Sequence, residues 1–393
     1  MSAPLYSAIE RELPTDESRA LLELTSDLVR AELLPRVDKA EDSADFPRDV
    51  FATLGDTGVL GLPFPEEFGG GGQPATVYLQ VIEELARGWL TVGMGTSVHI
   101  LSCHGIATAG TADQRARLLP DMLNNSLGAF CLSEAHAGSD IATMRTTARR
   151  IGDEYELNGS KAWITHGPVA DFYLVFARTG SAGSGGRGLS AFHVPAGTAG
   201  VSADMPERKM GLKGSLTSGV TFDHARIPAG NLIGAEGDGM AIALAALDSG
   251  RLGIAACATG LARSALDVAL RYAIERQAFG ERIVDFQGVG FLLADAATGI
   301  ESARALYLAA ARRKDAGLPF SAQAAMAKLT ATDMCMKVTT DMVQVLGGAG
   351  YVLDYPVERF MREAKVLQIL EGTNQIQRTV ILKSMLRPTG TAR

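Results

Sequence analysis

The sequence predicts an α+β multidomain protein with a helical domain at each end and a β domain between them. The pattern of its residues changes twice along the chain. Segments with helical periodicity give way to short β-branched and aromatic segments, and these give way to long amphipathic runs. A length of 393 residues accommodates two or three domains. We place the domains at residues 1–126, 127–236 and 237–393.

Helix signals dominate the N-terminal domain. Thr15 is a good N-cap, followed by an acidic first turn and the apolar-periodic LLELTSDLV. Pro47 stands near the first turn of a second, short helix. After the Pro/Gly break GLPFPEEFGGGG at 61–72, the runs ATVYLQVIEELA and ADQRARLLPDML predict further helices.

The middle domain is predicted to consist of strands joined by turns. The segments DEYELNG, ADFYLVFART, LSAFHVP and GVTFDHARIP are short, β-branched or aromatic, and bounded by turn residues. The glycine-rich SAGSGGRG at 181–188 lies between two of them. Because phosphate-binding loops lie between a strand and a helix, we interpret it as a strand connection.

The C-terminal domain is predicted to be an antiparallel helical bundle, since its long helices have short connections. The first helix, at 240–277, has about ten turns. The next three cover 284–317, 322–346 and 374–386. Ser321 is the expected N-cap of the third helix and Thr373 of the fourth.

The composition is typical of a globular cytoplasmic protein, with 47% hydrophobic and 21% charged residues. No apolar run approaches the roughly 18 residues of a membrane span. The polar N-terminus MSAPLYSAIERELPTDESR is not typical of a secretory signal or a transit peptide. A net charge of −7 argues against a nucleic-acid partner. Four cysteines lack metal-ligand spacing and are expected to be buried in reduced form: Cys103, Cys131, Cys257 and Cys335.

Common cofactor and metal motifs are missing. No G-x-G-x-x-G joins a strand to a helix, which leaves a Rossmann dinucleotide site without support. The six histidines show no H-E-x-x-H spacing, so no metal site is expected.

Three segments and one carboxylate carry more specific signals. AFCLSEAHAGSD at 129–140 leads from a strand into a loop of small and hydroxyl residues, which a flat polar ligand can approach closely. Trp163 in NGSKAWITHG is either a core residue or a stacking surface for an aromatic ring. Arg276 in ERQAFG is either a surface charge at a helix end or a phosphate ligand. Glu371 in LEGTNQIQR is either a charge before a helix or a catalytic group.

Together with other motifs, these segments resemble the FAD-dependent acyl-CoA dehydrogenase family over nearly the whole chain. Nine motifs occur in the order and spacing of the family: GLPFPEEFGGGG, SEAHAGSD, NGSKAWITHG, KMGLKGSLTS, LDSGRLGIAA, ERQAFGERIVDFQ, QVLGGAGY, YPVERFMREAK and LEGTNQIQR. The resemblance implies an N-terminal helical domain, a middle β-barrel and a C-terminal four-helix bundle. It also implies a homotetramer built as a dimer of dimers.

The resemblance implies roles for individual residues. The flavin ring would be held by Phe130, Leu132, Ser133, Gly138, Ser139, Trp163, Ile164 and Thr165. The rest of FAD would be held, partly across a subunit boundary, by Arg276, Phe279, Phe286, Gln287, Gln344, Gly347, Gly348, Thr373 and Gln375. The acyl-CoA would contact Ser139, Asp248, Arg251 and Gly372. Glu371 matches the catalytic base of the family.

The implied reaction is the α,β-dehydrogenation of an acyl-CoA thioester to the trans-2-enoyl-CoA, with electrons passed to an electron-transfer flavoprotein. Glu371 would take the proton, and FAD would take the hydride, which no side chain can accept. Isovaleryl-CoA dehydrogenases in the family place the base on the long helix, at the position of Gly250 here. Glycine has no base, so the resemblance favours straight-chain, short or medium acyl groups.

Two alternatives stay open: an acyl-CoA oxidase that uses oxygen, and a non-catalytic relative that binds flavin or acyl-CoA. The sequence fixes neither the acyl group nor the physiological acceptor. Four residues depart from those common in the family: Ala135, His136, His166 and Leu216. The two histidines fall near the implied flavin loops, where they either tune the flavin or only pack.

Overall fold

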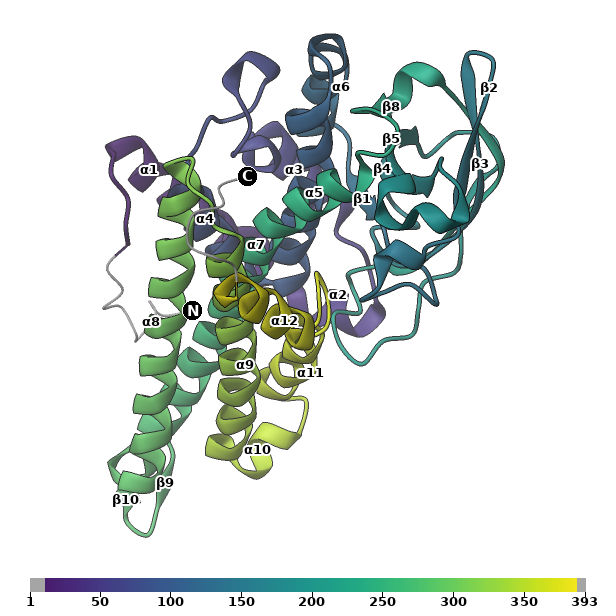
Figure 1. Cartoon of the computed structure of the whole chain (residues 1–393). Helices are drawn as coiled ribbons and strands as arrows, with labels where there is room; N and C mark the ends of the chain where they lie inside the picture. The colour runs from purple at the N-terminus through teal and green to yellow at the C-terminus, as the bar shows by residue number, and fades with distance from the viewer. Residues whose placement is uncertain (1–10, 387–393) are drawn as a thin grey trace.

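The computed structural model describes residues 11–386, so the segment MSAPLYSAIE, in which no leader is expected, lies outside the described residues. Helices at the two ends of the chain pack together into one body, and the strands form a second body beside it (Figure 1). The α+β fold with a helical region at each end and a β region in the middle is therefore confirmed.

The N-terminal region is helical, as predicted. Thr15 caps the first helix through a reciprocal capping box with Ser18, and Pro47 precedes the third helix. The α-helices are α1 (Asp16–Leu28), α2 (Val37–Ser43), α3 (Arg48–Asp56), α4 (Ala75–Gly88), α5 (Leu90–Ala109) and α6 (Ala112–Asn124). A π-helical turn, Val29–Leu33, follows α1.

The middle region is one eight-stranded sheet with its own core. Its strands are β1 (Gly128–Cys131), β2 (Thr147–Ile151), β3 (Glu154–Thr165), β4 (Phe172–Arg178), β5 (Leu189–Pro195), β6 (Val201–Ala203), β7 (Thr217–Pro228) and β8 (Leu232–Ile233). They pair in the order β6-β7-β3-β2-β4-β5-β8, and β1 pairs with β4. Among the described residues this pairing leaves β6 and β8 as ends, so the predicted barrel is not closed by hydrogen bonds. The stretch SAGSGGRG connects β4 to β5, as predicted.

Long helices build the C-terminal region. They are α7 (Gly239–Glu275), α8 (Gln287–Asp315), α9 (Ser321–Leu346) and α12 (Asn374–Met385), with the shorter α10 (Gly348–Tyr351) and α11 (Val357–Leu367). The hairpin strands β9 (Gln277–Ala278) and β10 (Glu281–Arg282) separate α7 from α8.

The two expected caps in this region have different outcomes. Thr373 caps α12, since its side chain accepts the amide of Ile376, and that prediction is confirmed. The prediction for Ser321 is wrong, because Phe320 is the N-cap and Ser321 is the first helical residue. The hydroxyl of Ser321 instead donates to Asp248 of α7 at 2.9 Å, a contact between helices that the local sequence does not reveal.

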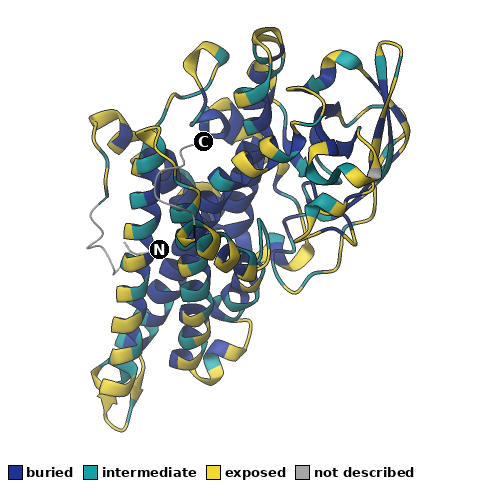
Figure 2. Ribbon diagram, viewed as in Figure 1, coloured by how far each residue is buried: buried dark blue, intermediate teal, exposed yellow. Residues whose placement is uncertain are grey.

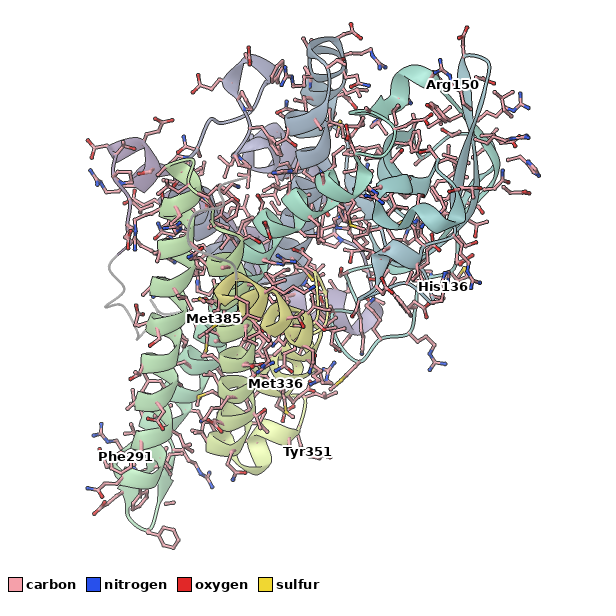
Figure 3. All side chains as sticks on the ribbon, viewed as in Figure 1. His136, Arg150, Phe291, Met336, Tyr351 and Met385 are labelled. Carbon is pink, nitrogen blue, oxygen red and sulfur yellow. The ribbon has the colours of Figure 1, made fainter. Side chains whose placement is uncertain are left out.

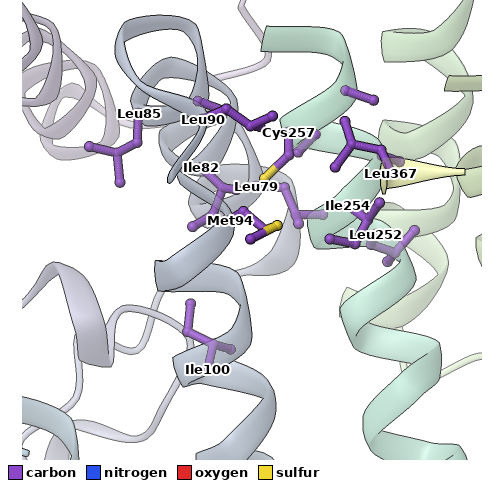
Figure 4. Packing of buried hydrophobic residues seen from close by; sticks show 14 of the residues in the cluster. Leu79, Ile82, Leu85, Leu90, Met94, Ile100, Leu252, Ile254, Cys257 and Leu367 are labelled. Carbon is purple, nitrogen blue, oxygen red and sulfur yellow. The ribbon is translucent and has the colours of Figure 1, made fainter. Parts of the chain in front are cut away.

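The core lies where α4 and α5 meet α7 (Figures 2 and 4). Ile82, Met94 and Ile100 pack on the same cluster as Leu252 and Ile254 of α7. Within the described residues, α7 alone is long and apolar enough by composition to cross a membrane, but 67% of its most apolar window is buried in the protein. Figure 2 shows the same helix in the buried centre of the body. It is the central core helix of this fold.

A buried ionic cluster joins α4 to α7 and α8. Glu83 is fully buried and accepts hydrogen bonds from Arg263 of α7 at 3.0 Å and from Arg304 and Tyr307 of α8 at 2.8 and 2.6 Å. Burial by itself raises the pKa of this carboxyl, but the surrounding guanidinium groups outweigh it and hold the pKa well below its usual range. The paired charges therefore fix how the N-terminal helices meet the bundle.

Candidate active site

The site begins with a tight turn between α11 and α12. Glu371 and Gly372 have φ angles of 50° and 90°, both in the left-handed region. Lys328 of α9 donates to the carbonyl oxygen of Gly372 at 3.0 Å and to Oδ1 of Asn374 at 2.9 Å. Gln377 of α12 donates to the same Gly372 carbonyl at 2.8 Å. Side chains from two helices thus hold a strained backbone in place.

The carboxylate of Glu371 is buried without a hydrogen-bond partner. Both of its oxygens are inaccessible to solvent and make no hydrogen bond within the described part of the chain, although the residue as a whole is half-buried. A Cβ built on Gly250 would lie 2.1 Å from Oε2, so the carboxylate packs directly on the backbone of α7. Burial raises the pKa of Glu371 to about 7, against the lowering effect of Lys328 and Arg251. A carboxyl with that pKa can act as a base near neutral pH.

The predicted acyl-CoA residues on α7 pair with each other. Arg251 donates to Asp248, which also accepts from Ser321 at 2.9 Å. Burial lowers the pKa of Arg251, and Asp248 opposes that shift. Asp248 and Arg251 flank Gly250 in sequence, so this ion pair lies beside the backbone on which the Glu371 carboxylate packs.

The two segments predicted to hold a flavin ring lie side by side. The amide of Ala162 on β3 donates to the carbonyl of Ser133 at 2.9 Å. Lys161, buried, pairs with Glu134 at 2.9 Å, and Glu134 also accepts the amides of Arg145 and Thr146. These contacts tie the loop after β1 to the end of β3. The structure thereby brings Leu132 and Ser133 next to the end of β3, which continues into Trp163, Ile164 and Thr165. Phe130 precedes them on β1, and Gly138 and Ser139 follow in the same loop.

Trp163 provides an exposed aromatic surface. It is 57% exposed and has a φ of 58°, beside a register shift in β3 between Lys161 and Ile164. A buried core role for Trp163 is therefore wrong. A large aromatic side chain directed out of the sheet, next to a loop of small and hydroxyl residues, fits a planar ring such as the flavin of FAD.

Helix α5 connects the flavin segments to the carboxylate. A Cβ on Gly95 would lie 2.9 Å from Nε2 of His166, the residue after Thr165. Further along the same helix, Leu101 lies 3.1 Å from the Cβ position of Gly250. Six residues separate these contacts, which is about 9 Å of helix axis. The end of β3 and the Glu371 carboxylate are therefore close neighbours along one helix.

The remaining predicted FAD residues lie away from the flavin segments in the folded chain. Seven of them gather at the far end of the bundle, around the end of α7, the start of α8 and the end of α9: Arg276, Phe279, Phe286, Gln287, Gln344, Gly347 and Gly348. Phe279 is 98% exposed and makes an edge-to-face contact with Phe286, with ring centres 6.2 Å apart. Phe291 and Tyr351, which mark this end in Figure 3, are exposed too. Thr373 and Gln375 lie apart from this group, at the start of α12.

The two histidines near the flavin segments have different environments. His166 is fully buried and meets the stacked rings of Phe46 and Phe51 edge-on, and its Nδ1 lies 3.0 Å from the carbonyl oxygen of Gly128. Burial lowers its pKa to about 4, so it is neutral at pH 7 and packs. His136 is exposed on the sheet side (Figure 3), with Nε2 3.3 Å from the carbonyl of Thr143.

Sequence reasoning missed several residues of the site. Lys328 was not singled out, although a single lysine within the small, apolar stretch AAMAKLTAT is an unusual residue to bury. A cavity of about 260 Å³ between α4, α5 and α7 was missed as well, because its walls come from distant parts of the chain. Gly250 and Leu101 form part of those walls, next to the Glu371 carboxylate.

Comparisons with known proteins match nearly the whole chain, from residue 15 to residue 386. Three family models match in sequence order: "Acyl-CoA dehydrogenase, N-terminal domain" at residues 15–126, "middle domain" at 129–225 and "C-terminal domain" at 237–386. An acyl-CoA dehydrogenase of Bacillus subtilis is 43% identical over 377 residues, which cover 95% of this chain and 99% of the relative.

Two solved structures are similar over their full length. Butyryl-CoA dehydrogenase from Megasphaera elsdenii matches with a TM-score of 0.93 and 39% identity, covering 96% of this chain and 100% of that one. A chain in a structure described as the electron transferring flavoprotein of Acidaminococcus fermentans matches with a TM-score of 0.93 and 41% identity, covering 95% and 98%.

Proposed function

This chain belongs to the acyl-CoA dehydrogenase family of FAD-dependent oxidoreductases, and from that premise we propose that it converts a straight-chain acyl-CoA to the trans-2-enoyl-CoA. Glu371 is the base that removes the proton next to the thioester carbonyl. The observation that carries this role is a buried carboxylate without a hydrogen-bond partner among residues 11–386. Its pKa is raised to about 7, and it packs on α7, which α5 links to the flavin segments.

The turn at Glu371 also supplies backbone amide donors for the reaction. Within the described part of the chain, no hydrogen bond engages the amides of Glu371 and Gly372. Donors in this position stabilise the negative charge that develops on a thioester carbonyl when its neighbouring carbon loses a proton. Lys328 and Gln377 keep the turn rigid, and Asp248 and Arg251 bind the CoA part of the substrate.

FAD, when bound, supplies the acceptor for the hydride. We assign its ring to Trp163 and the loop Phe130–Ser139, and its remaining parts to Thr373, Gln375 and the residues at the far end of the bundle. Since those last residues lie away from the flavin segments, a second subunit completes each site. This agrees with the exposed aromatic side chains at that end, and it supports a homotetramer.

The electron acceptor and the cellular compartment are proposed from the same premise. We propose that an electron-transfer flavoprotein accepts the electrons and that the enzyme works in the cytoplasm. The division into residues 1–126, 127–236 and 237–393 is our proposal for the domains. Short or medium acyl chains are favoured, as in the butyryl-CoA dehydrogenase relative.

The test is anaerobic titration of the purified protein with acyl-CoAs of increasing length. The expected result is a yellow protein whose flavin absorbance is bleached by at least one acyl-CoA, with formation of the enoyl-CoA. Hydrogen peroxide formed at the full turnover rate would instead identify an oxidase. A flavin-loaded protein that no acyl-CoA bleaches would overturn the proposal in favour of a non-catalytic relative.

A further inference from the structure

The cavity beside Gly250 has two kinds of wall. Apolar residues form most of it, from the loop before α4, from α4 and α5, and from the glycines of α7. Six polar side chains also line it: Tyr78, Ser97, His104, Thr108, Ser249 and Lys314. An acyl chain that ends in a methyl group satisfies the apolar walls but gives the polar groups nothing to bind.

Among these polar groups, the ring of His104 lacks a complete set of hydrogen-bond partners within the described residues. Its Nε2 lies 3.5 Å from the hydroxyl of Ser249, at the limit of a hydrogen bond, and its Nδ1 is buried with no partner within the described residues. Burial and the nearby charge of Lys314 lower the pKa of His104 to about 4, so the ring is neutral at pH 7. A neutral imidazole can donate one hydrogen bond to an acceptor in the cavity.

Lys314 is a cation without a carboxylate partner in the described part of the chain. Its ammonium donates to the hydroxyl of Tyr78 at 3.1 Å and lies 5.2 Å from the centre of that ring. Asp315, the adjacent carboxylate in sequence, is engaged elsewhere, because it accepts the amides of Ala75 and Thr76 at the start of α4. The charge of Lys314 therefore remains available to an anionic group in the cavity.

We propose that this cavity receives an acyl chain that carries a carboxylate at its far end, with Lys314 and His104 as the groups that bind it. The inference rests on the proposed function and names its substrate class: CoA monothioesters of dicarboxylic acids. The thioester end lies at Gly250 and Glu371, and the apolar walls contact the methylene groups between the two ends. Asp248 and Arg251 contact the CoA part, so the cation of Lys314 is not needed for the CoA phosphates.

Pairs of acyl-CoA substrates of equal chain length test whether the cavity binds a terminal carboxylate. Methyl-terminated acyl-CoAs of increasing length are each compared with the acyl-CoA of equal length that ends in a carboxylate, and kcat/KM is measured for both. At the length that reaches Lys314, the expected preference for the carboxylate is roughly 10–100-fold, the effect of a hydrogen bond to a charged group. The variant Lys314→Met should lose that preference while keeping its rate on the methyl-terminated substrate. His104→Leu should weaken it, and Lys365→Met, at an exposed position on α11, should leave it unchanged.

The outcomes separate the two proposals. A preference for the methyl-terminated member at every length overturns this inference and leaves the dehydrogenase function intact. An equal loss on both substrates in Lys314→Met also overturns it, since the cation would then act on the shared CoA part or on folding. A protein that retains FAD but is bleached by neither series overturns the proposed function itself.

Discussion

The carboxylate of Glu371 fills the space in front of Gly250, so that a Cβ at Gly250 would lie 2.1 Å from its Oε2. These residues are distant in sequence, and the resemblance makes both of them base positions within the family. A side chain at position 250 would reach the point beside α7 that the Glu371 carboxylate occupies, so the two positions cannot both place a carboxylate there. A glycine at 250 is what leaves room for the glutamate from the turn after α11.

Gly250→Ala should therefore impair catalysis more than folding. The added methyl displaces the carboxylate, and a displacement of about 1 Å can cost on the order of 100-fold in rate. We expect kcat to fall by that order while FAD content and thermal stability change little. Gly299→Ala, in the middle of α8, is the matched control, since its Cβ meets only the flexible side chain of Met334 at 3.0 Å. Equal activity in the two variants would show that Glu371 does not need this space.

The raised pKa of Glu371 predicts an acid limb in the pH profile. The reactive form is the carboxylate, and its fraction falls about tenfold for each pH unit below the pKa. Since that pKa is about 7, kcat/KM should rise with pH up to about 7 and then level off. Glu371→Gln should bind FAD and lose roughly 10²–10⁴-fold in rate at all pH values. A residual rate with the same acid limb would assign the limb to another group.

Lys328 should act on this profile as a positioning residue. Its charge lowers the pKa of Glu371, and its ammonium holds the Gly372 carbonyl at 3.0 Å. Lys328→Met should therefore shift the acid limb upward by roughly one pH unit. Activity should be reduced at pH 7 and partly restored at higher pH. Lys337→Met on the same helix, where the lysine is exposed and pairs with Asp341, should leave the limb in place. A loss that pH does not restore would indicate that Lys328 only supports the turn.

Trp163 should contribute to FAD binding without supporting the fold, because 57% of it is exposed. Trp163→Ala should weaken FAD binding by about tenfold, the effect of one aromatic stacking contact. Trp163→Phe retains an aromatic ring and should retain most of the affinity. The ratio of flavin to protein absorbance after gel filtration, together with thermal unfolding of both variants, checks this. Equal flavin retention in the two variants would remove Trp163 from the flavin site.

Much of the fold follows from local sequence signals. The capping residue Thr15, the proline before α3 and the short β-branched and aromatic segments of the middle region act within a few residues, so their effects are visible in the sequence. The same signals failed at Ser321, where a hydroxyl suited to capping reaches Asp248 of another helix instead. They also do not reveal α11, which begins within the motif YPVERFMREAK and continues beyond its end to Leu367.

The sequence by itself determined the three regions, their order and the motifs that point to Glu371, because periodicity, caps and motif spacing are properties of neighbouring residues. Only the tertiary structure decided that Glu371 packs on Gly250, that Lys328 holds its turn, and that His104 and Lys314 face one cavity. Those relationships join helices that are far apart along the chain, and the burial that raises the pKa of Glu371 exists only when these helices pack together.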